Sequence, residues 1–398
     1  MKNSFMNLGP EGLLESLRSN RRVEGLTHNF YNYPARFSPQ LARDVILEFS
    51  REQDCVVDPF MGGGTTIVEA IANGRKAVGI DINPLSHFIT EVKTRPLSQR
   101  DREEVMAWAH HFKALQSSDW PFPVGDPRLK NMPEEVVQVL GEAVSSLGQL
   151  EFRRQRRFAR CALLRLGQWA VDCRKDYESV TSMRMSLSKQ VTKMLMGLEE
   201  LNEAVSQRGI PKNKITGARM LYLGQSEKLL QGVNLGGSYP RPRLVLTSPP
   251  YPGVHVLYHR WQIRGRRETP APYWLADLRD GHWESYYTLG SRTPLGLRNY
   301  FRRIREIFGL LRELVDPNAT VVQLVAFSDP ETQVPPYLDA MKVAGYEEFM
   351  PFGNGRERPA RKVPNRKWYV QAEGDNHASN EILLFHRPCK RDTLQSRT

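Results

Sequence analysis

Apolar positions along the 398-residue chain change between short continuous runs and helical spacing. The clearest example begins with a helical stretch at residues 41–49 and an apolar run at residues 55–57. A second helical stretch starts at Thr66, and a second apolar run at residues 76–80 follows it. Short buried runs separated by helices are typical of parallel strands joined by crossover helices. The pattern therefore predicts one half of a doubly wound α/β sheet.

The same alternation returns in the second half of the chain. The predicted strands there span residues 220–223, 244–247, 320–327, 346–352, 368–373 and 381–386, and the predicted helices span residues 295–314 and 335–343. Residues 92–215 instead have apolar side chains at three- and four-residue steps, for example Val136, Val137, Leu140 and Val144. This spacing indicates a helical subdomain inserted into the sheet-forming chain.

These patterns divide the chain into six parts. Residues 1–91 contain a covering loop and the first half of the core, residues 92–215 form the helical subdomain, and residues 216–251 form the second half of the core. Residues 252–292 are an aromatic and basic region. Residues 293–387 form the rest of the core, with a basic loop at 353–367, and residues 388–398 are a polar tail.

The turn after the first predicted strand contains three successive glycines, Gly62 to Gly64, four residues after Asp58. Glycines let the backbone approach a ligand closely, and the helix that follows offers unpaired N–H groups. Asp81 ends the second strand, where an acid is placed to bind ribose hydroxyls. Taken alone, the glycines are equally consistent with a tight strand-to-helix turn.

Two motifs bring in a known family. The stretch Asp58-Pro59-Phe60-x-Gly62-x-Gly64-Thr65-Thr66 resembles the S-adenosylmethionine loop of amino-methyltransferases that act on exocyclic nitrogens of nucleic-acid bases. Ser248-Pro249-Pro250-Tyr251 resembles the catalytic loop of DNA amino-methyltransferases. The resemblance implies a Rossmann-like class I methyltransferase fold with S-adenosylmethionine as cofactor. The cofactor loop precedes the catalytic loop, which resembles a permuted motif order.

The resemblance also implies which residues contact the cofactor. Residues 27–39 are similar to the segment that covers the methionine end of the cofactor in this family, and Arg36 is placed to pair with its carboxylate. A surface salt bridge is an equal alternative for Arg36. Gln225 stands where the family often has an acid near the adenine. The complete predicted cofactor set is Tyr33, Arg36, Asp58, Pro59, Phe60, Gly62, Gly64, Thr65, Asp81 and Gln225.

The predicted catalytic residues are Ser248, Pro249, Pro250 and Tyr251. An exocyclic base amine is a poor nucleophile because its lone pair is delocalised into the ring. The Ser248 hydroxyl and the Pro249 carbonyl can accept the two amine hydrogens, and two prolines stiffen the loop. Tyr251 can stack on a base that has left the helix. Without the family resemblance, the tetrapeptide is also consistent with a simple proline turn.

The formal net charge of +12 favours a polyanionic partner, most simply nucleic acid. Residues 252–292 mix many aromatic side chains with arginines, which suits base stacking and phosphate contact; the alternative is a small packed subdomain with tryptophan in its core. The predicted DNA contacts are Arg260, Arg264, Arg266 and Arg267 there, and Arg361 and Lys362 in the basic loop. The run Arg153–Arg157 is either a solvated face or a phosphate contact.

The sequence predicts a site-specific methyltransferase of double-stranded DNA, with cytosine N4 favoured because serine before the two prolines accompanies cytosine more often in the resembling family. Adenine N6 methylation, RNA base methylation and a catalytically silent DNA-binding protein are the alternatives. A restriction endonuclease is an expected partner, and the expected location is the cytoplasm, on the nucleoid.

The four cysteines form no CxxC pair, which gives no support to a metal site or a disulfide framework. No apolar stretch of about 20 residues is available to cross a membrane.

Overall fold

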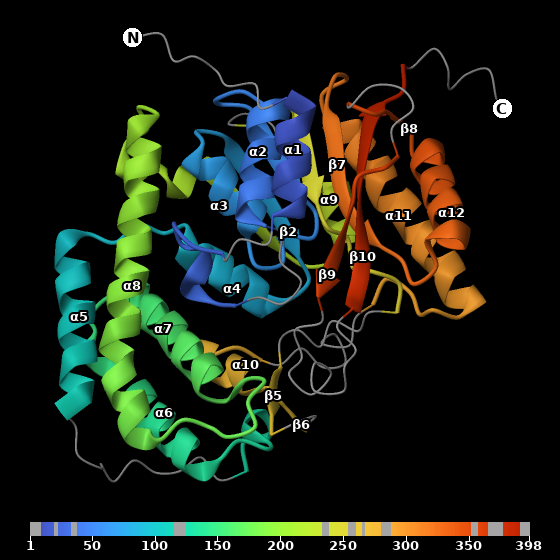
Figure 1. Cartoon of the computed structure of the whole chain (residues 1–398). Helices are drawn as coiled ribbons and strands as arrows, with labels where there is room; N and C mark the ends of the chain where they lie inside the picture. Colours follow the sequence, from blue (N-terminus) through green and yellow to red (C-terminus); the bar gives the residue numbers. More distant parts are fainter. Residues whose placement is uncertain are drawn as a thin grey trace.

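The computed structural model describes residues 9–19, 23–32, 38–114, 125–232, 239–253, 260–264, 267–279, 288–351, 357–364 and 377–390. Within these residues eight strands form one sheet at the centre of the molecule (Figure 1). The strands are β1 (Cys55–Asp58), β2 (Lys76–Asp81), β3 (Arg219–Leu223), β4 (Leu244–Thr247), β7 (Thr320–Ala326), β8 (Tyr346–Glu348), β9 (Ala360–Pro364) and β10 (His377–Pro388).

The order of the strands is β3-β2-β1-β4-β7-β10-β8, and β9 pairs with β10 off this path. The five strands from β3 to β7 are parallel, whereas β10 runs antiparallel to β7, β8 and β9. The chain moves outward from β1 to β3 and then returns to place β4 on the other side of β1. Such a reversal opens a crevice at the carboxyl ends of the strands. The strand order confirms the predicted Rossmann-like fold class.

Helices cover both faces of the sheet, so its central strands are buried on each side. Neighbouring strand residues alternate between the two cores: Val56 packs with α2 on one face, and Val57 packs with α11 on the other. Helices α1 (Gly9–Arg18), α2 (Pro39–Phe49) and α3 (Thr65–Ala72) belong to the first face, and helices α9 (Ser226–Gly232), α11 (Pro294–Leu314) and α12 (Pro330–Val343) belong to the second.

A further group of helices lies below and to the left of the α/β core in Figure 1, and its longest helix runs up beside that core. It contains α5 (Gln99–Ala114), α6 (Glu134–Ser146), α7 (Arg153–Val171) and α8 (Val180–Gln207), and α4 (Pro84–Lys93) connects it to the core. Short 3-10 turns lie at His28–Phe30, Pro127–Leu129, Leu147–Gln149, Lys212–Lys214 and Thr216–Ala218. None of the helices in the described ranges is both long and apolar enough to cross a membrane.

The aromatic region packs into this helical group through β5 (Trp261–Ile263), β6 (Arg267–Thr269) and α10 (Ala271–Ala276). Trp261 is 1% exposed, and its indole N–H donates to the Tyr31 hydroxyl at 3.0 Å. Tyr273 is equally buried and accepts from the Asn83 side chain at 2.9 Å. The interpretation of these two rings as base-stacking surfaces is therefore wrong, because both belong to a hydrophobic core. The alternative, a packed unit with tryptophan inside, describes residues 260–264 and 267–279.

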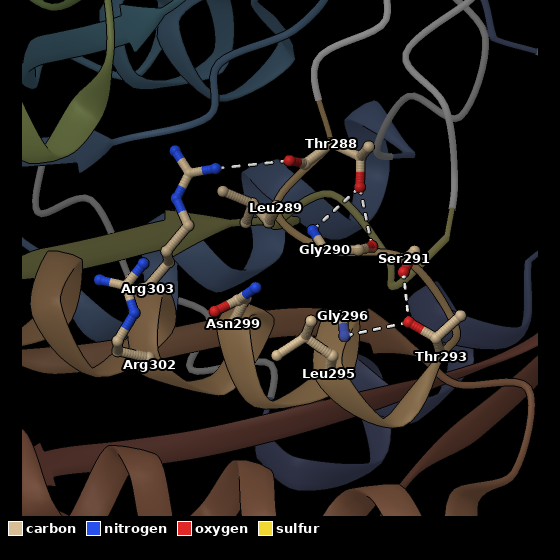
Figure 2. Close-up of a pocket in the computed structure, with 10 residues that line it drawn as sticks. All are labelled: Thr288, Leu289, Gly290, Ser291, Thr293, Leu295, Gly296, Asn299, Arg302 and Arg303. Atoms are coloured by element: carbon tan, nitrogen blue, oxygen red, sulfur yellow. Dashed lines mark hydrogen bonds between the residues drawn. The ribbon is translucent and has the colours of Figure 1, made fainter.

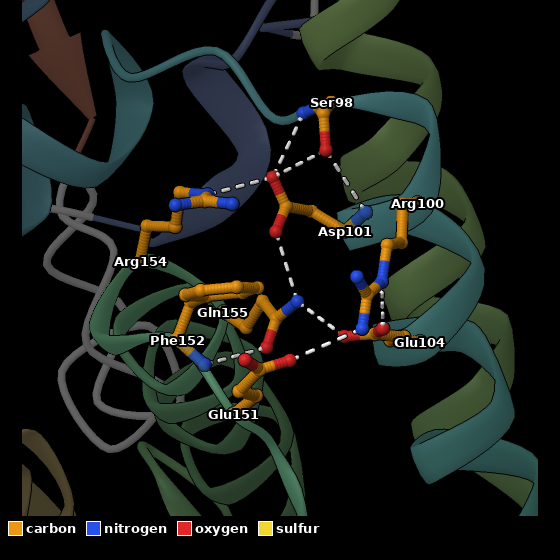
Figure 3. A network of polar contacts seen from close by, with 8 residues as sticks. All are labelled: Ser98, Arg100, Asp101, Glu104, Glu151, Phe152, Arg154 and Gln155. Carbon is orange, nitrogen blue, oxygen red and sulfur yellow. Dashed lines mark hydrogen bonds and ion pairs between the residues drawn. The ribbon is translucent and has the colours of Figure 1, made fainter.

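The basic run at the start of α7 is largely occupied by internal contacts (Figure 3). The Arg154 side chain donates to the Asp101 carboxylate at 2.7 Å, and Gln155 donates to the other oxygen of the same group at 2.8 Å. Arg157 forms an ion pair with Glu91, and Arg160 donates to the Leu275 carbonyl at 2.8 Å. These contacts favour a structural role for the run over phosphate contact.

The predicted basic loop at 353–367 differs from the structure, because residues 360–364 form strand β9. This strand has no apolar alternation, so its pattern gave no strand signal. It pairs with the start of β10, which begins at His377 and not at residue 381. Charged side chains such as Arg361 and Lys362 are typical of sheet edges. The strand predicted at 368–373 lies outside the described residues.

Candidate active site

The glycine turn after β1 has a backbone conformation that other residues rarely adopt. Gly62 and Gly64 have φ angles of +47° and +74°, a region that side chains rarely adopt. A Cβ atom on Gly64 would also lie 2.4 Å from the Thr90 hydroxyl. Helix α3 begins immediately afterwards at Thr65. The turn therefore needs glycine for its conformation and for its close approach to α4.

Asp81 closes this turn from the end of β2. The Gly62 N–H donates to one oxygen of its carboxylate at 2.8 Å, and the Asn83 N–H donates to the other at 2.8 Å. Burial raises the pKa of this carboxyl, and the two backbone N–H groups oppose that shift. Each carboxylate oxygen accepts more than one hydrogen bond, so this partly buried group keeps the capacity to bind hydroxyls.

Asp58 ends β1 and connects the glycine turn to the catalytic strand. It is 3% exposed, and one of its oxygens accepts from the Thr247 hydroxyl at 2.7 Å and from the Phe60 N–H at 3.1 Å. Burial raises the pKa of Asp58 to about 6. The Thr247 contact joins β1 to β4 one residue before Ser248. The side chain therefore fixes the two predicted loops relative to each other.

Gln225 lies beyond the end of β3, next to the strand that ends at Asp81. The Gly224 N–H donates to the Asp81 carbonyl at 2.9 Å, and the Ser226 hydroxyl donates to the Pro59 carbonyl at 2.5 Å. Leu223 is 49% exposed at this point. The structure thus brings the predicted residues of β1, β2 and β3 to one edge of the sheet. Tyr33 and Arg36 lie outside the described residues.

The Ser-Pro-Pro-Tyr loop leaves the same edge at the end of β4. The Ser248 hydroxyl donates to the Leu324 carbonyl on β7 at 3.0 Å. Its hydrogen is therefore engaged, and the oxygen lone pairs remain as acceptors. The Tyr251 hydroxyl lies 3.5 Å from the Ser248 oxygen and donates to the Glu381 carboxylate at 2.8 Å. Burial, reinforced by the Glu381 charge, raises the pKa of Tyr251 well above its ordinary value.

Glu381 is a residue of this site that sequence reasoning missed. It is 5% exposed on β10, and its second oxygen accepts from the Arg361 guanidinium at 2.7 Å. The only sequence signal was an acid at the start of an apolar run that predicted a buried strand. Arg361, which was predicted as a DNA contact, lies in this ion pair with a side chain that is 16% exposed.

Comparison with known proteins bears on this arrangement. Residues 14–91, which include the glycine turn, Asp58 and Asp81, match the family model described as DNA methylase. This segment belongs to the N6/N4 DNA methylase family. The type II methyltransferase M.MvaI of Kocuria varians is 31% identical over 118 residues, which are 29% of this chain and 26% of that protein.

Two further relatives match this chain over shorter stretches. The orphan methyltransferase M.BamHII of Bacillus amyloliquefaciens is 49% identical over 53 residues, 13% of this chain and 20% of that protein. The DNA adenine methyltransferase YhdJ of Escherichia coli K12 is 44% identical over 62 residues, 16% of this chain and 21% of that protein. The chain therefore spans about a quarter or less of the length of the curated relatives that it matches.

Among solved structures, the rRNA methyltransferase aviRa of Streptomyces viridochromogenes aligns with 96% of this chain and 95% of its own. The TM-score is 0.28 and the identity is 9%. The Rossmann-like fold is therefore shown by the strand order of the chain itself.

A pocket of about 380 Å³ lies near the Ser-Pro-Pro-Tyr loop, at the start of α11 (Figure 2). The Gly253 N–H donates to the Gly290 carbonyl at 2.8 Å, which ties the chain after Tyr251 to the pocket wall. Asn299 and Arg302 extend from the first turns of α11. Polar groups dominate the lining, which consists of Thr288, Leu289, Gly290, Ser291, Thr293, Leu295, Gly296, Asn299, Arg302 and Arg303.

The other predicted DNA-contact residues have different surroundings. Arg264 is exposed and stacks over the Tyr177 ring at 4.8 Å. Arg267 and Lys362 are exposed, and Arg260 is partly buried beside β5. Arg266 lies outside the described residues. DNA contact at these positions therefore stays a prediction.

Proposed function

We propose that this chain transfers a methyl group from S-adenosylmethionine to the exocyclic amine of a base in duplex DNA, and that the base is cytosine. The observation that supports this most is the placement of Ser248 and Asp81 at one edge of the sheet, on strands that flank β1. Doubly wound sheets bind their ligands at this edge. One group of residues there suits a nucleoside cofactor, and the other suits a base amine.

The residues around the glycine turn fit S-adenosylmethionine. Gly62 and Gly64 allow its close approach, and the partly buried Asp81 carboxylate is an acceptor for ribose hydroxyls. Leu223 presents an exposed apolar surface beside Gln225, as an adenine ring requires. When bound, this cofactor supplies an electrophilic methyl group on a sulfonium. The chain's own residues must then bring a weak nucleophile into line with it.

Ser248 is suited to that task because its hydroxyl hydrogen already bonds to the Leu324 carbonyl. Its oxygen then accepts one amine hydrogen, and the Pro249 carbonyl accepts the other. Both contacts favour the geometry in which the nitrogen lone pair leaves the plane of the base. Gly62, Gly64 and Asp81 would hold the cofactor, whose sulfonium would supply the methyl group to this lone pair. The nitrogen then carries an acidic proton, which it releases to water.

Duplex DNA is the proposed substrate because the relatives of this chain include proteins named as type II and DNA adenine methyltransferases. Serine before Pro249 favours cytosine N4 over adenine N6, although one relative is named for adenine. A cognate restriction endonuclease and a cytoplasmic, nucleoid-associated location are also part of the proposal.

Mass spectrometry of nucleosides tests the choice of base. Unmethylated genomic DNA is treated with the protein and S-adenosylmethionine, digested and compared with an untreated sample. We expect N4-methylcytosine to appear. A product that contains N6-methyladenine alone would refute the cytosine assignment while leaving methyl transfer to DNA in place.

A further inference from the structure

Four side chains from three parts of the sequence form one polar chain at the Ser-Pro-Pro-Tyr loop. Arg361 on β9 bonds to one oxygen of Glu381 at 2.7 Å, and Tyr251 bonds to the other oxygen at 2.8 Å. The Tyr251 oxygen lies 3.5 Å from that of Ser248. Glu381 lies opposite Ala326, where β7 ends at the edge that bears the catalytic loop. The β9–β10 pair is thus joined to the loop by one carboxylate.

A simple cross-strand ion pair is the first explanation to consider. Arg361 and Glu381 are direct partners across the β9–β10 ladder, where opposite charges are common. That explanation accounts for only one of the two carboxylate oxygens. The second oxygen bonds to Tyr251, which is separated from Glu381 by 130 residues and lies outside the sheet. Glu381 is buried, so such a carboxylate requires partners for both oxygens.

We propose that Glu381 and Arg361 are positioning residues that fix the Tyr251 ring against the target base. This inference rests on the proposed function. Arg361 balances the buried charge of Glu381 and orients its carboxylate. The carboxylate then holds the Tyr251 hydroxyl as a hydrogen-bond donor, so the ring has one orientation before the base arrives. The hydroxyl is therefore a tether, and the ring face is the surface left for stacking.

The tether has a consequence for Ser248. The Tyr251 hydroxyl donates to Glu381, and the Ser248 hydroxyl donates to Leu324. Neither hydroxyl therefore donates to the oxygen of the other. The Ser248 oxygen keeps its lone pairs for the base amine. Loss of the tether would free Tyr251 to turn and donate to Ser248, which would compete with the substrate.

The test compares three single variants in single-turnover methylation of genomic DNA. Tyr251→Phe removes the hydroxyl and keeps the ring, and Glu381→Gln removes the charge that Arg361 balances. Glu348→Gln is the matched control, because Glu348 pairs with Arg358 at 2.7 Å beside the same strands and bonds to no residue of the catalytic loop. Cofactor affinity, DNA affinity and the melting temperature are measured for each protein.

We expect the first two variants to lower the methylation rate by about tenfold or more, as misplaced reacting groups do. Their affinities for DNA and cofactor should stay within about twofold of wild type, and the control should keep the wild-type rate. A double variant that combines Tyr251→Phe with Glu381→Gln should methylate no more slowly than the slower of the two single variants, because both changes remove the same contact.

Wild-type rates in Tyr251→Phe and Glu381→Gln, with an active wild-type protein, would overturn the positioning role alone. If Glu381→Gln does not fold, the rate of Tyr251→Phe alone tests the positioning role. A wild-type protein that methylates no DNA would overturn the proposed function as well, so the two failures are distinguishable.

Discussion

Asp58 and Asp81 end neighbouring strands, but the structure gives them different environments. Each oxygen of the Asp81 carboxylate accepts one backbone N–H. The side chain remains partly exposed, as a ligand-binding carboxylate needs. Asp58 is buried and concentrates its contacts on one oxygen. We infer that Asp58 holds the two loops together, whereas Asp81 faces the cofactor.

Asp58 should make stability depend on pH in a direction opposite to that of a salt-bridged aspartate. Burial raises its folded pKa to about 6, above the ordinary aspartate value of 3.8. Between these values the folded state binds a proton that the unfolded state does not bind, so this group adds stability as the pH falls from about 6 to about 4. The contribution is on the order of 3 kcal/mol. Asp58→Asn should remove it.

Urea unfolding of both proteins across this pH range measures the effect. As the pH falls from about 6 to about 4, the free energy of unfolding of wild type should rise relative to that of Asp58→Asn. A difference that is constant with pH would show that the Asp58 pKa is not raised.

At the scale of elements, α11 and the segment before it are strongly positive, and they lie next to the Ser-Pro-Pro-Tyr loop. Residues 288–306 contain five arginines and one glutamate, and Arg303 pairs with Glu227 on α9. Arg302 lines the pocket beside the catalytic loop (Figure 2), while Arg305 is exposed one turn further along the helix and does not line it. We infer that the first turns of α11 contact a DNA phosphate.

Arg302→Ala should therefore weaken DNA binding and lower the salt dependence of log K by about one unit, because one phosphate contact is lost. Arg305→Ala removes the same charge from the same helix and should change the slope less. Binding of duplex DNA at several salt concentrations measures both. Equal slopes for the two variants would argue against a phosphate contact at the pocket.

Elements with local signals could be predicted from the sequence, and elements that depend on distant partners could not. The strands at residues 55–58 and 76–81 have apolar runs and a glycine turn between them, so their pattern suffices. The charged strand β9 exists because β10 pairs with it. The burial of Trp261 depends on Gly167, where a Cβ would lie 2.5 Å from the indole ring. Glu381 was missed for the same reason, since Tyr251 is its partner.

At the scale of the whole molecule, the carboxyl edge of one sheet unites the glycine turn, the catalytic loop and the α11 pocket. The helical group lies on the α4 side of this edge (Figure 1). Trp261 and Tyr273 are buried in its core. The net charge of +12 agrees with a polyanionic partner. The basic run on α7 is largely paired, so other surfaces must supply the phosphate contacts.

Transfer of a labelled methyl group tests the central claim most directly. Wild-type protein and Ser248→Ala are incubated with S-adenosylmethionine labelled in its methyl group, together with duplex DNA or with structured RNA of similar length. We predict label in DNA and not in RNA, with a rate at least about a hundredfold lower for Ser248→Ala because one acceptor of the amine hydrogens is lost. Absence of label from DNA with wild-type protein, or label confined to RNA, would contradict the account.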